Sequence, residues 1–256
     1  IGLAGPEACI YVLLEGRKDA PRVFAQLTQC DGSFIVGRQA EDFAWQNLRG
    51  KTILGGRKGG MPEMTLEYVM RKNGVIPHED ATVDTSVQFN MMAGAFVAGE
   101  ADYVALFEPT ATEVELAGQG VVLCSIGEQS GEIPYTAYFA AQSYLTENAD
   151  TVLRFTRAIA RGQEWVYAHT DRELAEAIVG YFPDTSVEVL EKVAARYKGI
   201  RAWKETPDMK QEALERAMDR LETVMEQAGE LSQRVAYEAL VENKFAYHVM
   251  AEMGQK

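Results

Sequence analysis

A glycine-rich segment, residues 55–60, carries the residue types that best suit ligand binding. It follows an apolar run, Lys51–Leu54, that predicts a strand, and it precedes Pro62–Lys72, whose apolar spacing predicts a helix. Proline is favoured in the first helical turn because its missing N–H would have no helical partner there. Free main-chain N–H groups at such a turn can hold an anion or a polar ligand atom. The contacts that we expect from this segment are Gly59, Gly60 and Met61.

Two basic residues in the same segment, Arg57 and Lys58, extend this chemistry. Together with the main-chain N–H groups they could hold a sulfonate, a phosphate or a carboxylate. Long charged side chains at the tip of a loop are also commonly solvated and without a ligand. The sequence leaves both interpretations open and favours the second.

Two further segments repeat the arrangement of a strand followed by the start of a helix. Ile1–Glu7 runs from an apolar strand through Gly-Pro to an acidic residue, and Tyr103–Thr110 runs from a strand directly into Glu-Pro-Thr. In open α/β sheets, ligands bind beyond the carboxyl ends of strands. We therefore expect the three segments to share one cleft, although Gly-Pro pairs also begin helices that bind nothing. The further candidate contacts are Gly5, Pro6, Glu7, Gln88, Phe89, Phe107, Glu108, Glu132 and Tyr135.

Glu108 is the candidate with the most specific chemistry. A carboxylate at the end of a strand could accept hydrogen bonds from an amino-substituted nitrogen heterocycle or attract a cationic ring. It could equally cap the helix that begins at Pro109 and be satisfied by local backbone groups. Trp203, in a loop, could stack on an aromatic ring.

Composition and charge narrow the classes of function. The chain has 256 residues and a net charge of −13, which argues against nucleic acid and anionic membranes as main partners. Three cysteines are too few for a disulfide framework. The histidines, at positions 78, 169 and 248, lack metal-ligand spacing. We therefore expect no metal site, no cofactor and no catalytic residue.

The order of predicted elements indicates an α/β fold. Strand and helix signals alternate from Lys51 to Gln142, which favours βαβ units and a mainly parallel sheet. Beyond Gln142 the pattern is helical, and Thr206-Pro207-Asp208 predicts the start of a long helix. The apolar residues from Tyr237 to Val249 predict one last helix.

Five motifs together resemble one known family. They are Gly-Leu-Ala-Gly-Pro-Glu-Ala (2–8), Leu-Thr-Gln-Cys-Asp-Gly-Ser-Phe (27–34), Gly-Gly-Arg-Lys-Gly-Gly-Met-Pro-Glu-Met-Thr-Leu-Glu-Tyr-Val (55–69), Leu-Phe-Glu-Pro-Thr-Ala (106–111) and Gly-Glu-Ile-Pro-Tyr-Thr-Ala-Tyr (131–138). The chain thereby resembles the SsuA/THI5-like (NMT1) substrate-binding proteins of ABC importers, a group that includes sulfonate, thiamine-precursor and riboflavin binders. The resemblance covers nearly the whole chain. It implies a type II periplasmic-binding-protein fold, in which two α/β lobes joined by hinge strands clamp the ligand.

The resemblance also implies how the chain divides. Residues 1–33 and 136–256 would form lobe one with the C-terminal helices, and residues 34–135 would form lobe two. The crossings between the lobes would lie near Asp31–Val36 and Pro134–Tyr138. Family members begin with a signal peptide, a lipid-attachment cysteine and roughly two further strand–helix units. We therefore expect lobe one to be truncated at its N-terminus in this chain and to lack its first strands.

The function that the resemblance implies is transport. We expect the extracytoplasmic solute-binding component of an ABC importer, with a small nitrogen-containing aromatic nutrient of the thiamine or pyrimidine-precursor type as its ligand. Its partners would be the permease and ATPase of the importer, and no nucleic acid. It would lie at the extracellular face of the cell membrane as a lipoprotein, or in the periplasm, and would touch the membrane only through a lipid anchor expected upstream of this chain.

Two alternatives remain beside this hypothesis. Within the same class, the ligand could be an organosulfonate, a nitrate-type anion or riboflavin. In another class, the chain could resemble the THI5-like enzyme that synthesises a pyrimidine with iron. The second alternative is disfavoured because that chemistry needs clustered cysteine and histidine residues, and these are dispersed here.

Overall fold

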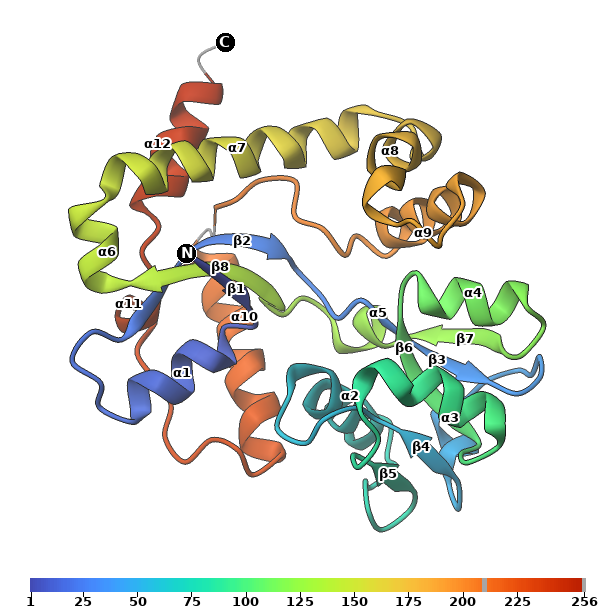
Figure 1. The fold of residues 1–256 in the computed structure, drawn as a ribbon. Coiled ribbons are helices and arrows are strands. Elements are labelled where there is room, and N and C mark those ends of the chain that lie inside the picture. The colour runs from blue at the N-terminus through green and yellow to red at the C-terminus, as the bar shows by residue number, and fades with distance from the viewer. Residues whose placement is uncertain (209–210, 255–256) are drawn as a thin grey trace.

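Two separate β-sheets form the framework of the molecule (Figure 1). The computed structural model describes residues 1–208 and 211–254. The first sheet has three strands in the order β1-β8-β2, and the second has five strands in the order β5-β4-β6-β3-β7. The strands are β1 (Gly2–Ala4), β2 (Pro21–Thr28), β3 (Ser33–Gly37), β4 (Thr52–Leu54), β5 (Thr82–Asp84), β6 (Tyr103–Phe107), β7 (Val121–Ser125) and β8 (Thr136–Ala141).

Helices make up most of the rest of the described chain. The α-helices are α1 (Glu7–Leu14), α2 (Met61–Lys72), α3 (Met92–Ala98), α4 (Thr110–Leu116), α5 (Ile126–Ser130), α6 (Gln142–Glu147), α7 (Ala149–Ala168), α8 (Asp171–Ile178), α9 (Val187–Gly199), α10 (Gln211–Gln227), α11 (Tyr237–Leu240) and α12 (Lys244–Met253). Short 3-10 helices are η1 (Trp45–Leu48), η2 (Phe89–Met91) and η3 (Val179–Tyr181). Within the described residues, no helix combines the length and the apolar character needed to cross a membrane.

The first sheet is antiparallel throughout, with β8 between β1 and β2. Helices α7 and α12 pack together above it in Figure 1. The buried ring of Phe24 in β2 joins the sheet to both helices, because it meets Phe155 of α7 and Phe245 of α12 edge to face at centroid distances of 6.1 and 6.3 Å. Such aromatic pairs stabilise the packing of the helices on the sheet by more than the burial of their apolar surface alone would.

The second sheet mixes strand directions. β4 is parallel to β5 and β6, whereas β3 lies antiparallel between β6 and β7. The first sheet is antiparallel throughout, whereas in the second sheet β4, β5, β6 and β7 all run in one direction, as the prediction of a mainly parallel sheet requires, and β3 alone runs against them. The physical reason is that β3 arrives through the short segment 29–32 from the other sheet and not through a crossover helix.

Two predicted helices differ from the observed ones. The predicted start at Thr206–Asp208 is wrong, because these three residues are not helical and the Pro207 carbonyl instead accepts a hydrogen bond of 3.0 Å from the Gln26 amide of β2. The single last helix that was expected over 237–249 is divided into α11 and α12. Extended backbone at 241 separates them, since Val241 forms a bridge with Val23.

Two segments connect the sheets, residues 29–32 and residues 126–135. They approach each other so closely that a Cβ on Gly127 would lie 2.0 Å from the carbonyl oxygen of Asp31. Only glycine fits at this contact. The proposed lobe boundaries, 33/34 and 135/136, fall at the ends of these connections, and the division into two closing lobes stays a prediction.

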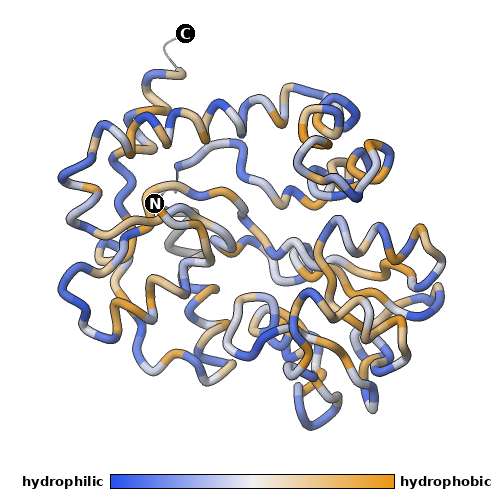
Figure 2. Tube along the Cα trace, in the orientation of Figure 1, coloured by the Kyte–Doolittle hydropathy of each residue, from blue (hydrophilic) through white to orange (hydrophobic). Residues whose placement is uncertain are grey.

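Apolar clusters explain how the elements pack. Along β3, Ile35 belongs to the cluster under α2, whereas Phe34 and Val36 belong to the cluster under α3, so opposite faces of the second sheet are covered by different helices. Figure 2 shows apolar positions following the strands of this sheet. A further cluster joins Ile10 of α1 to Met64 of α2, and it links the N-terminal segment to the second sheet's helix.

Candidate functional site

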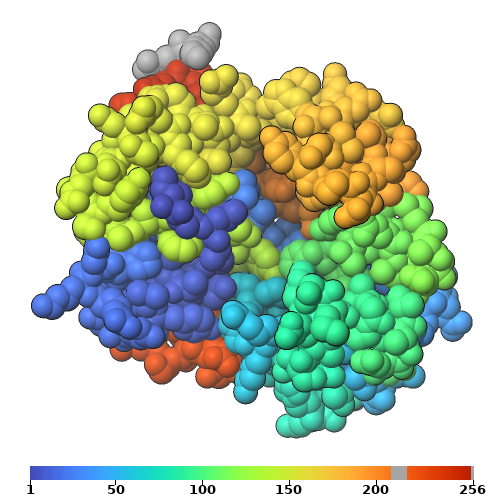
Figure 3. Space-filling view, in the orientation of Figure 1, coloured from blue at the N-terminus to red at the C-terminus, as the bar shows by residue number. Residues whose placement is uncertain are grey.

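A central hollow lies where the parts of the molecule that carry the two sheets meet (Figure 3). In this view its rim is formed by the dark-blue N-terminal segment, the light-blue segment near residue 60, the green segment near residue 110 and the orange segment near residue 190. The three strand–helix junctions predicted from the sequence lie in the first three of these segments.

Glu7, the first residue of α1, folds back over the turn that precedes it. A Cβ on Gly5 would lie 1.9 Å from Glu7 Oε2, so a larger residue at position 5 would displace the carboxylate. This oxygen is buried and has no hydrogen-bond partner in the described part of the chain. Burial raises the pKa of Glu7 to about 7, against the opposing effects of a backbone hydrogen bond and the positive charge of Arg57. Near neutral pH this carboxyl group can therefore accept hydrogen bonds from a ligand or attract a cation.

Gly59 brings the glycine-rich segment into contact with the N-terminal part of the chain. Its carbonyl accepts a hydrogen bond of 3.3 Å from the Tyr11 hydroxyl of α1, and its N–H donates to Glu63 Oε2 at 3.1 Å. Its φ of 71° lies in the left-handed region, and a Cβ there would approach the Glu230 carboxylate to 3.3 Å. Glycine suits this position because both its backbone conformation and its surroundings disfavour a side chain.

The surroundings of Tyr11 are acidic. The pKa of its hydroxyl is raised to about 12, first by burial and then by the negative charges of Glu230, Glu7 and Glu63, with Arg57 opposing them. Three carboxylates and one guanidinium therefore act on the Tyr11 hydroxyl and on the Gly59 carbonyl that it contacts. A cationic or N–H-rich ligand matches such a field better than an anion does.

A row of aromatic rings continues the site. Phe107 at the end of β6 lies 5.6 Å from Phe89 and 6.2 Å from Tyr135, measured between ring centroids. Phe89 is 54% exposed, whereas Tyr135 is 8% exposed, so the row runs from the surface into the interior. A Cβ on Gly32 would approach Phe107 Cδ1 to 3.4 Å, which places the first connection beside this row. Exposed ring faces and edges of this kind can stack on a planar ligand.

Tyr135 and Asp31 are buried polar groups beside these rings. Burial raises the pKa of Asp31 to about 6, and hydrogen bonds from Ser33 oppose that shift. The pKa of Tyr135 is raised well above its ordinary value by burial and then by the charge of Asp31. The Tyr135 hydroxyl and the Asp31 carboxyl group also interact with each other, which lowers the pKa of Asp31 and raises that of Tyr135. The two groups therefore form a buried polar pair beside the aromatic rings.

Glu108 takes the second of the roles that the sequence left open. Its side chain is 0% exposed and lies 2.6 Å from the Arg196 guanidinium of α9. It also accepts hydrogen bonds of 2.9 Å from both the backbone N–H and the hydroxyl of Thr112 in α4. The Glu108 backbone N–H donates to the Tyr197 hydroxyl at 3.1 Å. The carboxylate is therefore engaged within the protein and joins α4 to α9.

The remaining predicted contacts lie in different surroundings. Met61 is 3% exposed and packs in the apolar cluster that includes α1. Gln88 is exposed at the start of η2, and Pro6 and Gly60 are buried in their turns. Trp203 meets Tyr197 edge to face at 5.3 Å and so packs within the protein.

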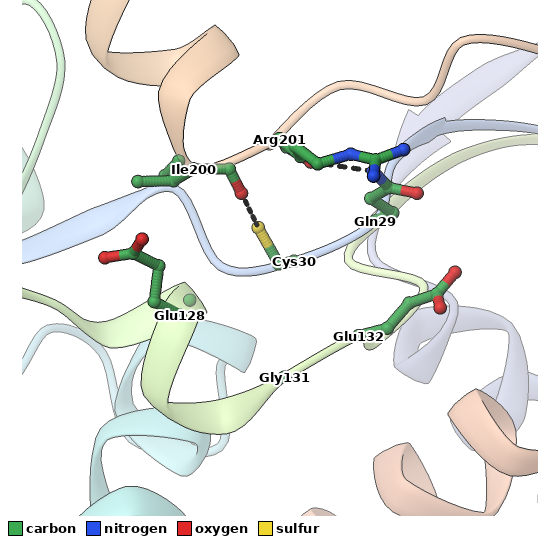
Figure 4. A pocket seen from close by; sticks show the side chains of 8 residues that line it. Gln29, Cys30, Glu128, Gly131, Glu132, Ile200 and Arg201 are labelled. Carbon is green, nitrogen blue, oxygen red and sulfur yellow. Dashed lines mark hydrogen bonds between the residues drawn. The ribbon is translucent and has the colours of Figure 1, made fainter.

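Glu132 lines another hollow, of about 330 Å³, which Figure 4 shows from close by. Its wall is made by residues of the first connection, the second connection and the end of α9: Gln29, Cys30, Gly127, Glu128, Gly131, Glu132, Ile200 and Arg201. No other predicted contact lines this hollow. Glu132 therefore lines a different hollow from the one proposed for Glu7 and Phe107.

Sequence reasoning missed several residues of the site. Tyr11 and Glu230 both contact Gly59, and Asp31 lies beside Tyr135. The motif at 27–34 contains Asp31 and could have pointed to it. No local pattern links Glu230 to Gly59, because the two lie 171 residues apart in the chain (230 − 59).

Comparison with known proteins places the chain among binding proteins. A family model described as "NMT1/THI5 like" matches residues 21–173. "Putative binding protein YtlA" of Bacillus subtilis (strain 168) is 43% identical over 253 residues, which cover 98% of this chain and 75% of that protein.

Solved structures with similar folds include anion-binding proteins. The alkanesulfonate-binding protein SsuA from Xanthomonas axonopodis pv. citri, bound to MOPS, has a TM-score of 0.73 at 18% identity, covering 94% of this chain and 80% of that one. The periplasmic nitrate-binding protein NrtA from Synechocystis PCC 6803 has a TM-score of 0.69 at 15% identity, covering 98% and 72%. The desulfurization enzyme DszB has a TM-score of 0.63 at 14% identity, covering 98% and 85%. These likenesses show a type II periplasmic-binding-protein fold.

Proposed function

Because the chain belongs to the NMT1/THI5-like family and is a solute-binding protein of an ABC import system, we propose that it holds a small nitrogen-containing aromatic solute in the central hollow. An aminopyrimidine is the simplest ligand of this class. The observation that carries the proposal is Glu7 Oε2, which is buried and has no hydrogen-bond partner among the described residues. A buried carboxylate oxygen without a donor is costly, and a ligand N–H would satisfy it.

The field around Glu7 supports a ligand that carries N–H groups or positive charge. The pKa of Glu7 is raised to about 7 chiefly because burial disfavours its charged form. A ligand that donates a hydrogen bond or carries positive charge would stabilise that charged form. Glu230 and Glu63 add negative charge on the same side, as the raised pKa of Tyr11 indicates. These carboxylates would repel an anionic ligand.

The aromatic row supports a planar ligand. Phe89, Phe107 and Tyr135 lie within 6.2 Å of their neighbours between ring centroids. Phe89 exposes 54% of its surface, which leaves ring area available to a ligand. Stacking on such rings holds a flat heterocycle without demanding one orientation, and a polar group such as Glu7 then sets that orientation.

An organosulfonate or a nitrate-type anion is the second candidate. Arg57 is exposed in the glycine-rich segment, where it could meet an anion together with main-chain N–H groups. Riboflavin remains a further candidate on its aromatic character alone. The carboxylates around Tyr11 favour the aminopyrimidine class over the anions.

We further propose that ligand binding closes the two predicted lobes. Residues 1–33 with 136–256 would move against residues 34–135 about the connections 29–32 and 126–135. Glu7 would belong to one lobe and Phe107 to the other. A ligand can contact both residues at once only in the closed arrangement, so its binding would favour that arrangement. The closed protein would then meet the permease of the importer, outside the cell or in the periplasm, with a lipid anchor as the proposed membrane attachment. In this proposal the chain releases the solute chemically unchanged, unlike the THI5-like enzyme.

Calorimetric titration with 4-aminopyrimidine derivatives, riboflavin, taurine and nitrate tests the ligand. We expect a clear isotherm with an aminopyrimidine. Glu7→Gln should weaken that binding about tenfold or more, since a hydrogen bond to a charged group is lost. Arg57→Gln should leave it within about twofold, and Glu176→Gln on the exposed face of α8 serves as the matched control. Mass spectrometry of the mixture should show an unaltered ligand.

The contrary result is equally definite. A clear isotherm with taurine or nitrate that is lost in Arg57→Gln, beside flat traces for the heterocycles, would replace the proposal with the anion-binding alternative. Conversion of the heterocycle or of its precursor by the purified protein would replace it with the enzyme alternative.

A further inference from the structure

Three side chains that could ligate a metal ion converge behind the glycine-rich segment. They are Glu63 and Glu67, one helical turn apart on α2, and His78 in the loop that follows this helix. One donor atom from each lies within 4.8 Å of the others. Helical spacing of four residues explains why the two carboxylates face the same way, and the loop brings the imidazole over them.

Neighbouring groups engage both oxygens of Glu67 and one oxygen of Glu63. Glu67 Oε2 lies 3.0 Å from the Arg71 guanidinium, while Glu67 Oε1 lies 2.7 Å from His78 Nε2. Glu63 Oε2 accepts the Gly59 N–H at 3.1 Å, and the carboxyl groups of Glu63 and Glu67 also hydrogen-bond to each other. In metal sites, such outer partners orient the ligating groups. Arg71 and Gly59 stand in this position here.

The backbone also fixes the imidazole. His78 has a φ of 64°, in the left-handed region that non-glycine residues seldom occupy. Its N–H donates to the Ala81 carbonyl at 2.8 Å, which holds the loop in this conformation. The side chain is 55% exposed, so a hydrated ion can reach the site from solvent.

Burial and charge favour a group that offsets the two carboxyl groups. Glu63 and Glu67 are 4% and 3% exposed, and Arg71 forms an ion pair with Glu67. Two buried carboxylates side by side need a shared proton, a protonated histidine or a cation to offset the second negative charge. A divalent ion would supply that charge and would use all three converging donors.

We propose that Glu63, Glu67 and His78 form a binding site for a divalent transition-metal ion such as Zn²⁺ or Mn²⁺. One imidazole nitrogen with two carboxylate oxygens suits these ions better than Ca²⁺ or Mg²⁺, which prefer oxygen ligands alone. With three protein ligands, the remaining coordination positions of the ion would be open to water. The site would act structurally, because Glu63 holds Gly59 and Gly59 in turn contacts Tyr11.

Titration of tag-free, chelator-treated protein with ZnCl₂ tests the site. We expect saturation at about one Zn²⁺ per chain at micromolar concentration, and little heat with MgCl₂ or CaCl₂. His78→Gln should weaken Zn²⁺ binding by about tenfold or more. Glu67→Gln should have a similar effect. The thermal midpoint of the native chain should rise by about 5 to 10 °C at a hundredfold excess over Kd, and that of His78→Gln should rise less.

His248→Gln is the matched control, because His248 also lies near a glutamate one turn away, at 3.2 Å from Glu252, but on the exposed face of α12. This variant should bind Zn²⁺ as the native chain does. Since the exposed imidazole of His78 can be replaced without opening the core, failure of Glu67→Gln to fold would leave His78→Gln as the deciding variant. Equal Zn²⁺ affinity in His78→Gln and the native chain, or no saturable binding at all, would overturn the proposal and leave an ordinary His–Glu–Arg ion network.

Discussion

Replacing Arg196 with methionine should destabilise the protein markedly, because Arg196 neutralises a carboxylate that has no access to solvent. Glu108 is 0% exposed and Arg196 is 24% exposed, with 2.6 Å between their charged atoms. Arg196→Met keeps the aliphatic stem but removes the guanidinium. Among the described residues, Glu108 then keeps its two hydrogen bonds from Thr112 and no ion pair.

The magnitude follows from this geometry. Removing one partner of a buried ion pair typically costs about 3 to 5 kcal/mol. The partial exposure of Arg196 and the donors of Thr112 reduce this, so we expect about 2 to 3 kcal/mol of lost stability. For a chain of this size, the thermal midpoint should fall by about 5 to 10 °C. Glu108→Gln combined with Arg196→Met should be less destabilised than the sum of the two single variants.

Urea unfolding monitored by circular dichroism measures these differences. Arg172→Met is the matched control, because Arg172 also contacts several glutamates but is 45% exposed, and it should cost less than about 1 kcal/mol. If Arg196→Met costs no more than Arg172→Met, the reasoning that the Glu108 contact is buried and structural is wrong.

Two further outcomes follow from the close contact between the two connections and from the burial of Glu7. Gly127→Ala should lower the free energy of unfolding by several kcal/mol or prevent folding, because the new Cβ would lie 2.0 Å from the Asp31 carbonyl oxygen. Gly162→Ala is the control: its Cβ would meet open space, so its thermal midpoint should equal or exceed that of the native chain. The pKa of the Glu7 carboxyl group is raised from 4.5 to about 7 in the folded chain, so the folded chain binds a proton there more tightly than the unfolded chain does. The stability that this proton contributes is present below about pH 4.5 and is lost as the pH rises to about 7. Glu7→Gln should therefore gain up to about 3 kcal/mol relative to the native chain between pH 4.5 and 8, measured by urea unfolding at each pH; a pH-independent difference would contradict the shift.

Local patterns predicted the elements that support the site. The apolar runs at 103–107 and 121–125 coincide with β6 and β7, and Pro62 lies in the first turn of α2 as its chemistry requires. These features depend on neighbouring residues alone. The sequence therefore indicated where the glycine-rich segment would meet a helix.

Long-range contacts account for what the sequence did not predict. The direction of β3 depends on its partners β6 and β7, which lie about seventy residues or more further along the chain. The role of Glu108 was decided by Arg196, which sits on a helix 88 residues away. Likewise, the spacing of the histidines alone does not show that Glu63 and Glu67, at helical spacing on α2, lie beside His78.

A crystal structure of the protein grown with a 4-aminopyrimidine is the decisive measurement of where the ligand binds. We expect the ring in the central hollow, with its amino group on Glu7 and its face or edge against Phe107 and Tyr135. A ring bound in the hollow that Glu132 lines, or a central hollow that instead holds a sulfonate on Arg57, would contradict it.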